Sequence, residues 1–213
     1  MRPLILVAAS GLAREAAAAA TASGTYDVLG FVDDNVELHG ETFEGVKVLG
    51  GVAELADHPD AHVVICAGKG SSRAAIAQRL LEYGVDDQRY ATVVHPSVSV
   101  PESCSIGAGS IVLAQVALTA AVTVGQHCVV MPNVTLTHDN VLNDYVTIAA
   151  NVALGGWVNV GSYSYLGMSS SVRERVVIGS SVTVGMGAVV LNDVPEGMTM
   201  IGNPARSITR RST

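Results

Sequence analysis

A strict six-residue spacing of aliphatic residues between Val94 and Val190 constrains the fold of this chain more than any other feature. An α-helix repeats its apolar face about every 3.6 residues and a simple strand every second residue, so neither produces a period of six. A short fixed period is typical of a solenoid, in which stacked repeats bury a shared core. The aliphatic positions are Val94, Val100, Ile106, Val112, Leu118, Val124, Val130, Leu136, Leu142, Ile148, Leu154, Val160, Leu166, Val172, Ile178, Val184 and Val190.

A second, mostly small position follows each aliphatic position by four residues, for example at Cys104, Ser110 and Ser164, with Asn140 as a polar exception. We interpret it as a second inward-facing position. Glycine also recurs in an eighteen-residue rhythm at Gly107, Gly125, Gly161 and Gly179, and Asn143 occupies the gap. Three hexapeptides therefore form one triangular coil of a parallel β-helix. Because glycine and asparagine tolerate positive φ, we expect these residues at a tight corner.

Composition narrows the class of protein. The 213-residue chain has a formal net charge of −7, which argues against a nucleic-acid partner. Its first thirty residues lack the pattern of a cleavable signal, and the run Ala16–Ala20 is too short to span a membrane. The sequence thus predicts a soluble, cytoplasmic protein. Cys66, Cys104 and Cys128 form no close-spaced metal or redox motif and are interpreted as small buried residues.

The residues before the repeat alternate between apolar runs and helix-forming segments. This alternation predicts a small parallel sheet with helices on its faces, a Rossmann-like α/β domain over residues 1–90. The β-helix then occupies residues 91–213, and the tail Met198–Ile208 is expected to cap its last coil. Expected strands are Arg2–Ala9, Tyr26–Val32, Gly45–Leu49 and His62–Ala67, and expected helices are 12–23 capped by Ser10, 52–56, and 71–83 capped by Ser71.

Three polar turns follow the expected strands: Ser10–Leu12, Asp33–Asp34 and Gly68–Gly70. Ligands of parallel α/β sheets bind beyond the carboxyl ends of the strands. The helix N-terminus after Ser10 and Gly11 suits an anion such as phosphate, and an acidic pair suits a ribose or sugar hydroxyl. The turns predict nucleotide or sugar-nucleotide binding, although each could also be an ordinary solvated loop.

Within the repeat, the polar sequence Thr137-His138-Asp139-Asn140 interrupts the pattern. The equivalents of His138 one coil below and above are Ala120 and Gly156, so the imidazole should stand on a nearly bare wall. Such a gap favours a groove that holds a substrate against the histidine. The alternative is an exposed histidine beside an acidic neighbour.

These motifs together resemble one family. They are the hexapeptide array, the Ser10-Gly11 turn, Gly30–Asp34, the His138-Asp139 pair, and the ending Asp193–Pro195 with Gly202–Arg206. The family is that of bacterial left-handed β-helix acyltransferases, of the sialic acid O-acetyltransferase and UDP-4-amino-sugar N-acetyltransferase type. The resemblance implies the left hand of the β-helix, a homotrimer with sites between neighbouring chains, and acetyl-CoA as co-substrate without a metal.

The resemblance also implies residue roles. His138 would be the general base, oriented by Asp139. Ser10, Gly11 and Leu12 would border the phosphates of a nucleotide sugar, Asp33 and Asp34 its uridine part, and Gly68 the pocket wall. Asn133 matches a polar position before the histidine; Thr147, Met168 and Met186 match the coenzyme A groove. Many relatives carry a histidine in place of Leu12 and of Thr147, which leaves the identity of the sugar and one contact open.

The function expected from these observations is acetyl-CoA-dependent N-acetylation of a nucleotide-linked amino sugar, with UDP as the expected nucleotide. O-acetylation of a sugar or sialic acid by the same residues is the alternative within enzymes. A metal-dependent lyase would need three converging histidines, of which His127 and His138 are available. A non-enzymatic nucleotide-sugar-binding protein is the remaining alternative.

Overall fold

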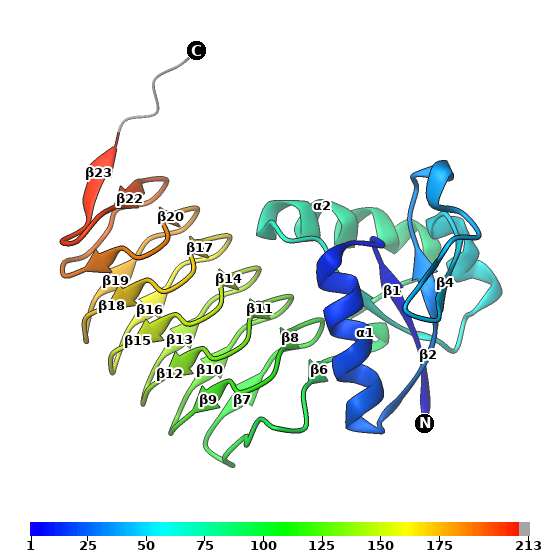
Figure 1. Ribbon diagram of the computed structural model, residues 1–213, viewed down its shortest axis with the longest axis horizontal. Coiled ribbons are helices and arrows are strands. Elements are labelled where there is room, and N and C mark those ends of the chain that lie inside the picture. The colour runs from blue at the N-terminus through cyan, green and yellow to red at the C-terminus, as the bar shows by residue number, and fades with distance from the viewer. Residues whose placement is uncertain (209–213) are drawn as a thin grey trace.

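The computed structural model of the protein describes residues 1–208. It contains an α/β unit followed by a parallel β-helix, as the hexapeptide spacing predicts, and the two lie side by side (Figure 1). The β-helix is left-handed, as the family resemblance implies. The α/β sheet has the strand order β3-β4-β2-β1-β5, parallel except for β3. Its strands are β1 (Arg2–Val7), β2 (Tyr26–Val32), β3 (Thr42–Phe43), β4 (Val46–Gly50) and β5 (His62–Ile65).

The helices of the α/β unit begin and end close to their predicted positions. Helix α1 (Gly11–Ser23) starts after Ser10, whose Oγ accepts a hydrogen bond from the Ala13 amide at 3.2 Å. Helix α2 (Gly70–Leu80) starts after Lys69, and Ser71 lies inside it, so the predicted Ser71 cap is wrong. Short 3₁₀ turns complete the unit: η1 (Val36–Leu38), η2 (Val52–Asp57), η3 (Leu81–Tyr83) and η4 (Asp87–Arg89).

The β-helix has three sheets, here called sheets 1, 2 and 3, and each coil contributes one two-residue strand to each. Strands of a sheet pair in parallel with partners eighteen residues away, such as Thr123 with Val141. Sheet 1 contains β7 (Ser105–Ile106), β10 (Thr123–Val124), β13 (Val141–Leu142), β16 (Asn159–Val160) and β19 (Val177–Ile178). Sheet 2 contains β6 (Val93–Val94), β8 (Ile111–Val112), β11 (Val129–Val130), β14 (Thr147–Ile148), β17 (Tyr165–Leu166) and β20 (Thr183–Val184). Sheet 3 contains β9 (Ala117–Leu118), β12 (Thr135–Leu136), β15 (Ala153–Leu154), β18 (Ser171–Val172) and β21 (Val189–Val190).

The corner glycines are required for a different physical reason from the one expected. Gly107, Gly125, Gly161 and Gly179 do not have positive φ. A Cβ at Gly161 would lie 2.5 Å from the Ser180 amide nitrogen, so glycine is needed where one coil passes close over the next. From Gly109 to Gly187 the left-handed conformation falls instead three residues after each aliphatic position, mostly on non-glycine residues, among them Asn133, Asp139, Tyr145 and Trp157.

The tail closes the solenoid as expected. Strand β22 (Thr199–Ile201) extends sheet 2 by pairing with β20, and β23 (Arg206–Ile208) turns back antiparallel to β22. Residues 209–213 lie outside the described part of the chain.

The β-helix core is an aliphatic column formed by the inward residues of all three sheets. A second core joins the two units: alanines of α1 pack with Leu4 and Leu6 and with Ile111 and Val129 on the outer face of sheet 2. Burial of this apolar surface therefore holds the α/β unit against sheet 2 and leaves sheets 1 and 3 uncovered by it.

Candidate active site

The main cavity lies between the N-terminus of α2 and the outer face of sheet 2, and has a volume of about 930 Å³. The α/β unit contributes Leu12 and Gly68–Ser72. The β-helix contributes small, hydroxyl-bearing, aromatic and methionine side chains. They are Val129, Met131, Thr147, Ala149, Ala150, Tyr163, Tyr165, Met168, Ser181 and Thr183.

A buried arginine fastens α2 to this wall. The Arg73 side chain donates six hydrogen bonds, all to carbonyl or hydroxyl oxygens, among them His127 O at 2.7 Å and Thr147 Oγ1 at 3.0 Å. Burial lowers the pKa of Arg73 to about 10, which still leaves it charged at neutral pH. Gly70 packs so closely on the Tyr145 carbonyl that a side chain there would clash with it. The position of α2, and with it the shape of the cavity, therefore depends on Arg73.

The predicted residues of the α/β unit lie at the carboxyl ends of its strands, but they divide into two groups. Leu12 and Gly68 line the cavity. Ser10 and Gly11 begin α1, and the Ser10 hydroxyl donates to Cys66 O at 2.7 Å.

The two aspartates already have partners within the unit. The Asp33 carboxylate accepts a hydrogen bond from the Ala9 amide at 2.9 Å, and Asp34 forms an ion pair with Arg79 at 2.6 Å. Neither lines the cavity, although the Asp33 carboxylate joins the ends of β1 and β2 next to the first turn.

The residues expected in the coenzyme A groove also divide. Thr147 and Met168 line the cavity, and Thr147 donates to Gly68 O at 3.0 Å, so it is buried in the contact with α2. Met186 is 68% exposed and does not line the cavity. Asn133 is exposed and adopts the left-handed conformation at the corner that joins sheets 2 and 3.

His138 lies on a different edge of the molecule, at the corner that leads from β12 of sheet 3 to β13 of sheet 1; we call it the His138 corner. His138 Nδ1 lies 2.8 Å from Asp139 Oδ2. An ionised carboxylate only accepts hydrogen bonds, so Nδ1 carries the proton and the lone pair of the neutral imidazole is on Nε2. Among residues 1–208, Nε2 has no hydrogen-bond partner, and the side chain is 47% exposed.

Residues of the following coils cover one side of the His138 imidazole. Gly156 lies directly against the imidazole, and a side chain there would clash with it, so the structure needs glycine at this position. The next residue, Trp157, has a large side chain that covers part of this wall. Its ring contacts the imidazole edge-on, with centroids 4.3 Å apart and planes at 87°. The Arg175 guanidinium then lies 4.2 Å from the centroid of the Trp157 ring.

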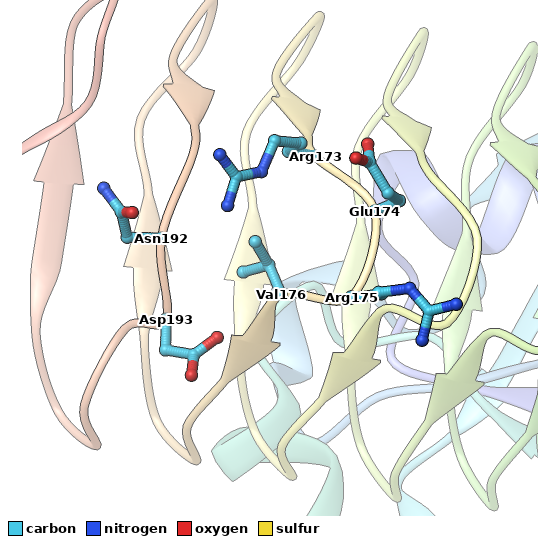
Figure 2. Close-up of a pocket in the computed structure, with 6 residues that line it drawn as sticks. All are labelled: Arg173, Glu174, Arg175, Val176, Asn192 and Asp193. Carbon is cyan, nitrogen blue, oxygen red and sulfur yellow. The ribbon is translucent and has the colours of Figure 1, made fainter.

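Trp157 and Arg175 were not predicted as site residues from the sequence. The signal was the eighteen-residue step, which places both residues on the His138 corner above Asp139. A further hollow of about 570 Å³ lies higher on this corner, between Arg173–Val176 and Asn192–Asp193 (Figure 2). There Arg173 points toward Asn192, whereas Arg175 projects the opposite way.

His127 is not part of this corner. It is buried between Tyr90 and Tyr145 at the corner from sheet 1 to sheet 2, with ring centroids 4.4 and 5.0 Å away. Burial, reinforced by Arg73, lowers the pKa of His127 to about 4. The structure thus does not bring His127 and His138 together as a metal site would need. Within residues 1–208, no group of three or more His, Cys, Asp or Glu side chains could hold a metal ion.

The fold is that of the hexapeptide-repeat acyltransferases of the left-handed β-helix type, as the sequence resemblance implied. Residues 3–80 match the PglD N-terminal domain family. No curated protein sequence matches the chain. Among the helices of the described chain, none has the length and apolar character needed to span a bilayer.

Solved structures similar to the whole chain include bacterial acetyltransferases. The acetyltransferase domain of PglB from Neisseria gonorrhoeae is 29% identical, with a TM-score of 0.88 over 98% of this chain and 100% of that one; it has also been solved with acetyl coenzyme A. PerB from Caulobacter crescentus, solved with CoA and GDP-perosamine, is 26% identical, with a TM-score of 0.89 over 97% of both chains. WeeI from Acinetobacter baumannii is 25% identical, with a TM-score of 0.80 over 98% of this chain and 100% of that one.

Proposed function

We propose that this protein transfers the acetyl group of acetyl-CoA to the amino group of a nucleotide-linked amino sugar. The observation that carries the proposal is the shared cavity: Leu12 and Gly68, expected to contact the acceptor, line the same space as Thr147 and Met168, expected to contact coenzyme A. A transferase needs both substrates side by side. The similar structures solved with acetyl coenzyme A, or with CoA and GDP-perosamine, support the same pair of substrates.

In this proposal, residues 1–90 hold the acceptor and residues 91–213 provide the base and the coenzyme A groove. The N-terminus of the eleven-residue helix α2 opens on the cavity beside Lys69, and both features favour a diphosphate. Asp33 and Asp34 would receive the nucleoside. Uridine is the nucleoside expected from the sequence, and guanosine is the alternative suggested by the Caulobacter relative.

His138 acts as the general base. Its Nε2 accepts a proton from the amine as the amine nitrogen attacks the thioester carbonyl carbon, and Asp139 stabilises the imidazolium that forms. The carbon–sulfur bond then breaks, and the coenzyme A sulfur takes the proton back from Nε2. The products are the N-acetylated sugar and free coenzyme A, so atoms and charges balance.

The base of one chain serves the cavity of another. His138 lies at the corner between sheets 3 and 1, whereas the cavity lies on sheet 2, and His138 does not line it. A complete site therefore needs a second copy of the chain, which agrees with the homotrimer expected from the sequence and with closed symmetry.

The first test replaces the base. His138→Ala should lower kcat about 10²–10⁴-fold, the usual contribution of a positioned general base. Asp139→Asn should cost less, because the imidazole remains but is less well oriented. Steady-state kinetics with nucleotide-linked amino sugars and matched hydroxyl sugars measure both effects and separate N- from O-acetylation.

Acetyl-CoA binding, measured by calorimetry, and the melting temperature should stay close to wild type in both variants, because His138 points off the core. A folded His138→Ala protein that retains near-normal turnover would rule out this mechanism.

A further inference from the structure

We propose that Trp157 is a positioning residue for the base: its indole holds the His138 imidazole, and Arg175 holds the indole. The inference rests on the proposed function, since it concerns the orientation of the proposed base. Trp157 contacts the imidazole of His138 directly, and we assign it a role that acts through His138 rather than on substrate.

The imidazole is constrained from two sides. Asp139 holds Nδ1 at 2.8 Å, and the Trp157 ring meets the imidazole at 87° with centroids 4.3 Å apart. An exposed histidine held by one hydrogen bond alone can still rotate among staggered rotamers. An edge-to-face aromatic contact prefers one geometry, so Trp157 selects the rotamer that leaves Nε2 free for the amine.

Arg175 in turn holds the Trp157 indole in place. The indole is 47% exposed and would itself be mobile without a neighbour. The guanidinium lies over the ring at 4.2 Å, within the range of a cation–π interaction. Asp139, Trp157 and Arg175 occupy equivalent places in successive coils, so the backbone ladder sets their order along the corner.

The β-helix itself does not need a tryptophan at this place. The corners from Gly109 to Gly187 adopt the left-handed conformation whatever their side chain, and the position equivalent to Trp157 two coils below holds Ala121. Bulky side chains adopt this conformation against their preference. A large aromatic residue that is half exposed at a disfavoured φ is better explained by its contact with His138 than by packing.

The test compares variants of Trp157 by kcat and KM. Trp157→Ala should lower kcat by about 10–100-fold, because a small misplacement of a catalytic group has effects of this size. The KM values for acetyl-CoA and acceptor should change little. Trp157→Phe keeps an aromatic ring against the imidazole and should recover most of the lost kcat.

A matched pair of arginines separates position from charge. Arg175→Ala should lower kcat less than Trp157→Ala does. Arg173→Ala removes the same charge from the same coil, but Arg173 points away from Arg175, so kcat should stay at the wild-type value (Figure 2).

The fluorescence of the chain provides a readout that needs no turnover, because Trp157 is its sole tryptophan. Emission should change when His138→Ala removes the imidazole from the indole, and should not change in Arg173→Ala. Unchanged kcat in Trp157→Ala would refute the inference. So would a rise in KM alone, which would make Trp157 a substrate contact, or a loss of melting temperature with normal turnover per folded chain.

The two proposals fail in different ways. An inactive His138→Ala beside a fully active Trp157→Ala would refute only the role of Trp157. A fully active His138→Ala would refute the proposed base itself.

Discussion

Two histidines of the β-helix have opposite environments. His138 is half exposed and bonded to a carboxylate, whereas His127 is 3% exposed and its Nδ1 has no partner among the described residues. Burial disfavours the charged imidazole of His127, with Arg73 adding repulsion. Both residues are histidines, so it is their difference in exposure that distinguishes the candidate base His138 from the packed ring of His127.

His127 should make the protein sensitive to acid. Its pKa falls from 6.5 to about 4 in the folded chain, so between these values the unfolded chain binds a proton that the folded chain does not. Stability should therefore fall as pH decreases from 6.5 toward 4, by at most about 3 kcal/mol from this group. Urea unfolding of wild type and His127→Phe at pH 7.5 and 4.5 measures the effect.

The Phe variant should show a smaller acid-induced loss, since the ring stays between Tyr90 and Tyr145 without a titrating nitrogen. Equal losses in both proteins would assign the acid sensitivity to other groups.

At the scale of elements, helix α2 is the part whose position the cavity depends on. Arg73 binds carbonyls from the turn before α2 and from β-helix residues more than fifty positions away in sequence. Loss of a buried polar partner leaves these oxygens unsatisfied, and each costs on the order of 1–3 kcal/mol.

Arg73→Met should lower the free energy of unfolding by about 3–5 kcal/mol, because it leaves several buried oxygens without a donor. It should also raise the acceptor KM, because α2 lines the cavity. Arg73→Lys should recover little, since an ammonium group cannot reproduce the planar fork of donors. Chemical denaturation and kinetics check this. A normal acceptor KM in a destabilised Arg73→Met protein would show that α2 does not position the acceptor.

At the scale of the whole molecule, a shared site predicts complementation between chains. His138→Ala removes the base, and Lys69→Glu reverses a charge at the cavity; each homotrimer should be nearly inactive. In an equal co-expressed mixture of the two variants, about a quarter of all sites combine an intact base with an intact cavity from neighbouring chains, whereas about one site in three does so in a purified mixed trimer. The mixture should therefore regain about a quarter of wild-type activity.

Differently tagged chains allow purification of the mixed trimers, and light scattering gives the oligomeric state. If both functions came from one chain, no mixed trimer would contain an intact site, and activity would stay at the level of the separate variants. A monomer at micromolar concentration would also contradict the shared site.

The sequence by itself determined the repeat, because inward positions of a β-helix accept side chains of one size at one period, and that period is visible without coordinates. It also predicted the strand-end turns and the His138-Asp139 pair, since these are local. The tertiary structure alone decided what the corners do: the glycines allow coils to approach, while Asp139, Tyr145 and Trp157 take the left-handed turns. It alone showed that Arg73 connects α2 to Thr147, and that Trp157 covers His138. The eighteen-residue step places Trp157 on the same corner as His138 but does not show that the two rings touch. Arg73 and Thr147 share no period in the sequence, so only the docking of the α/β unit brings them together.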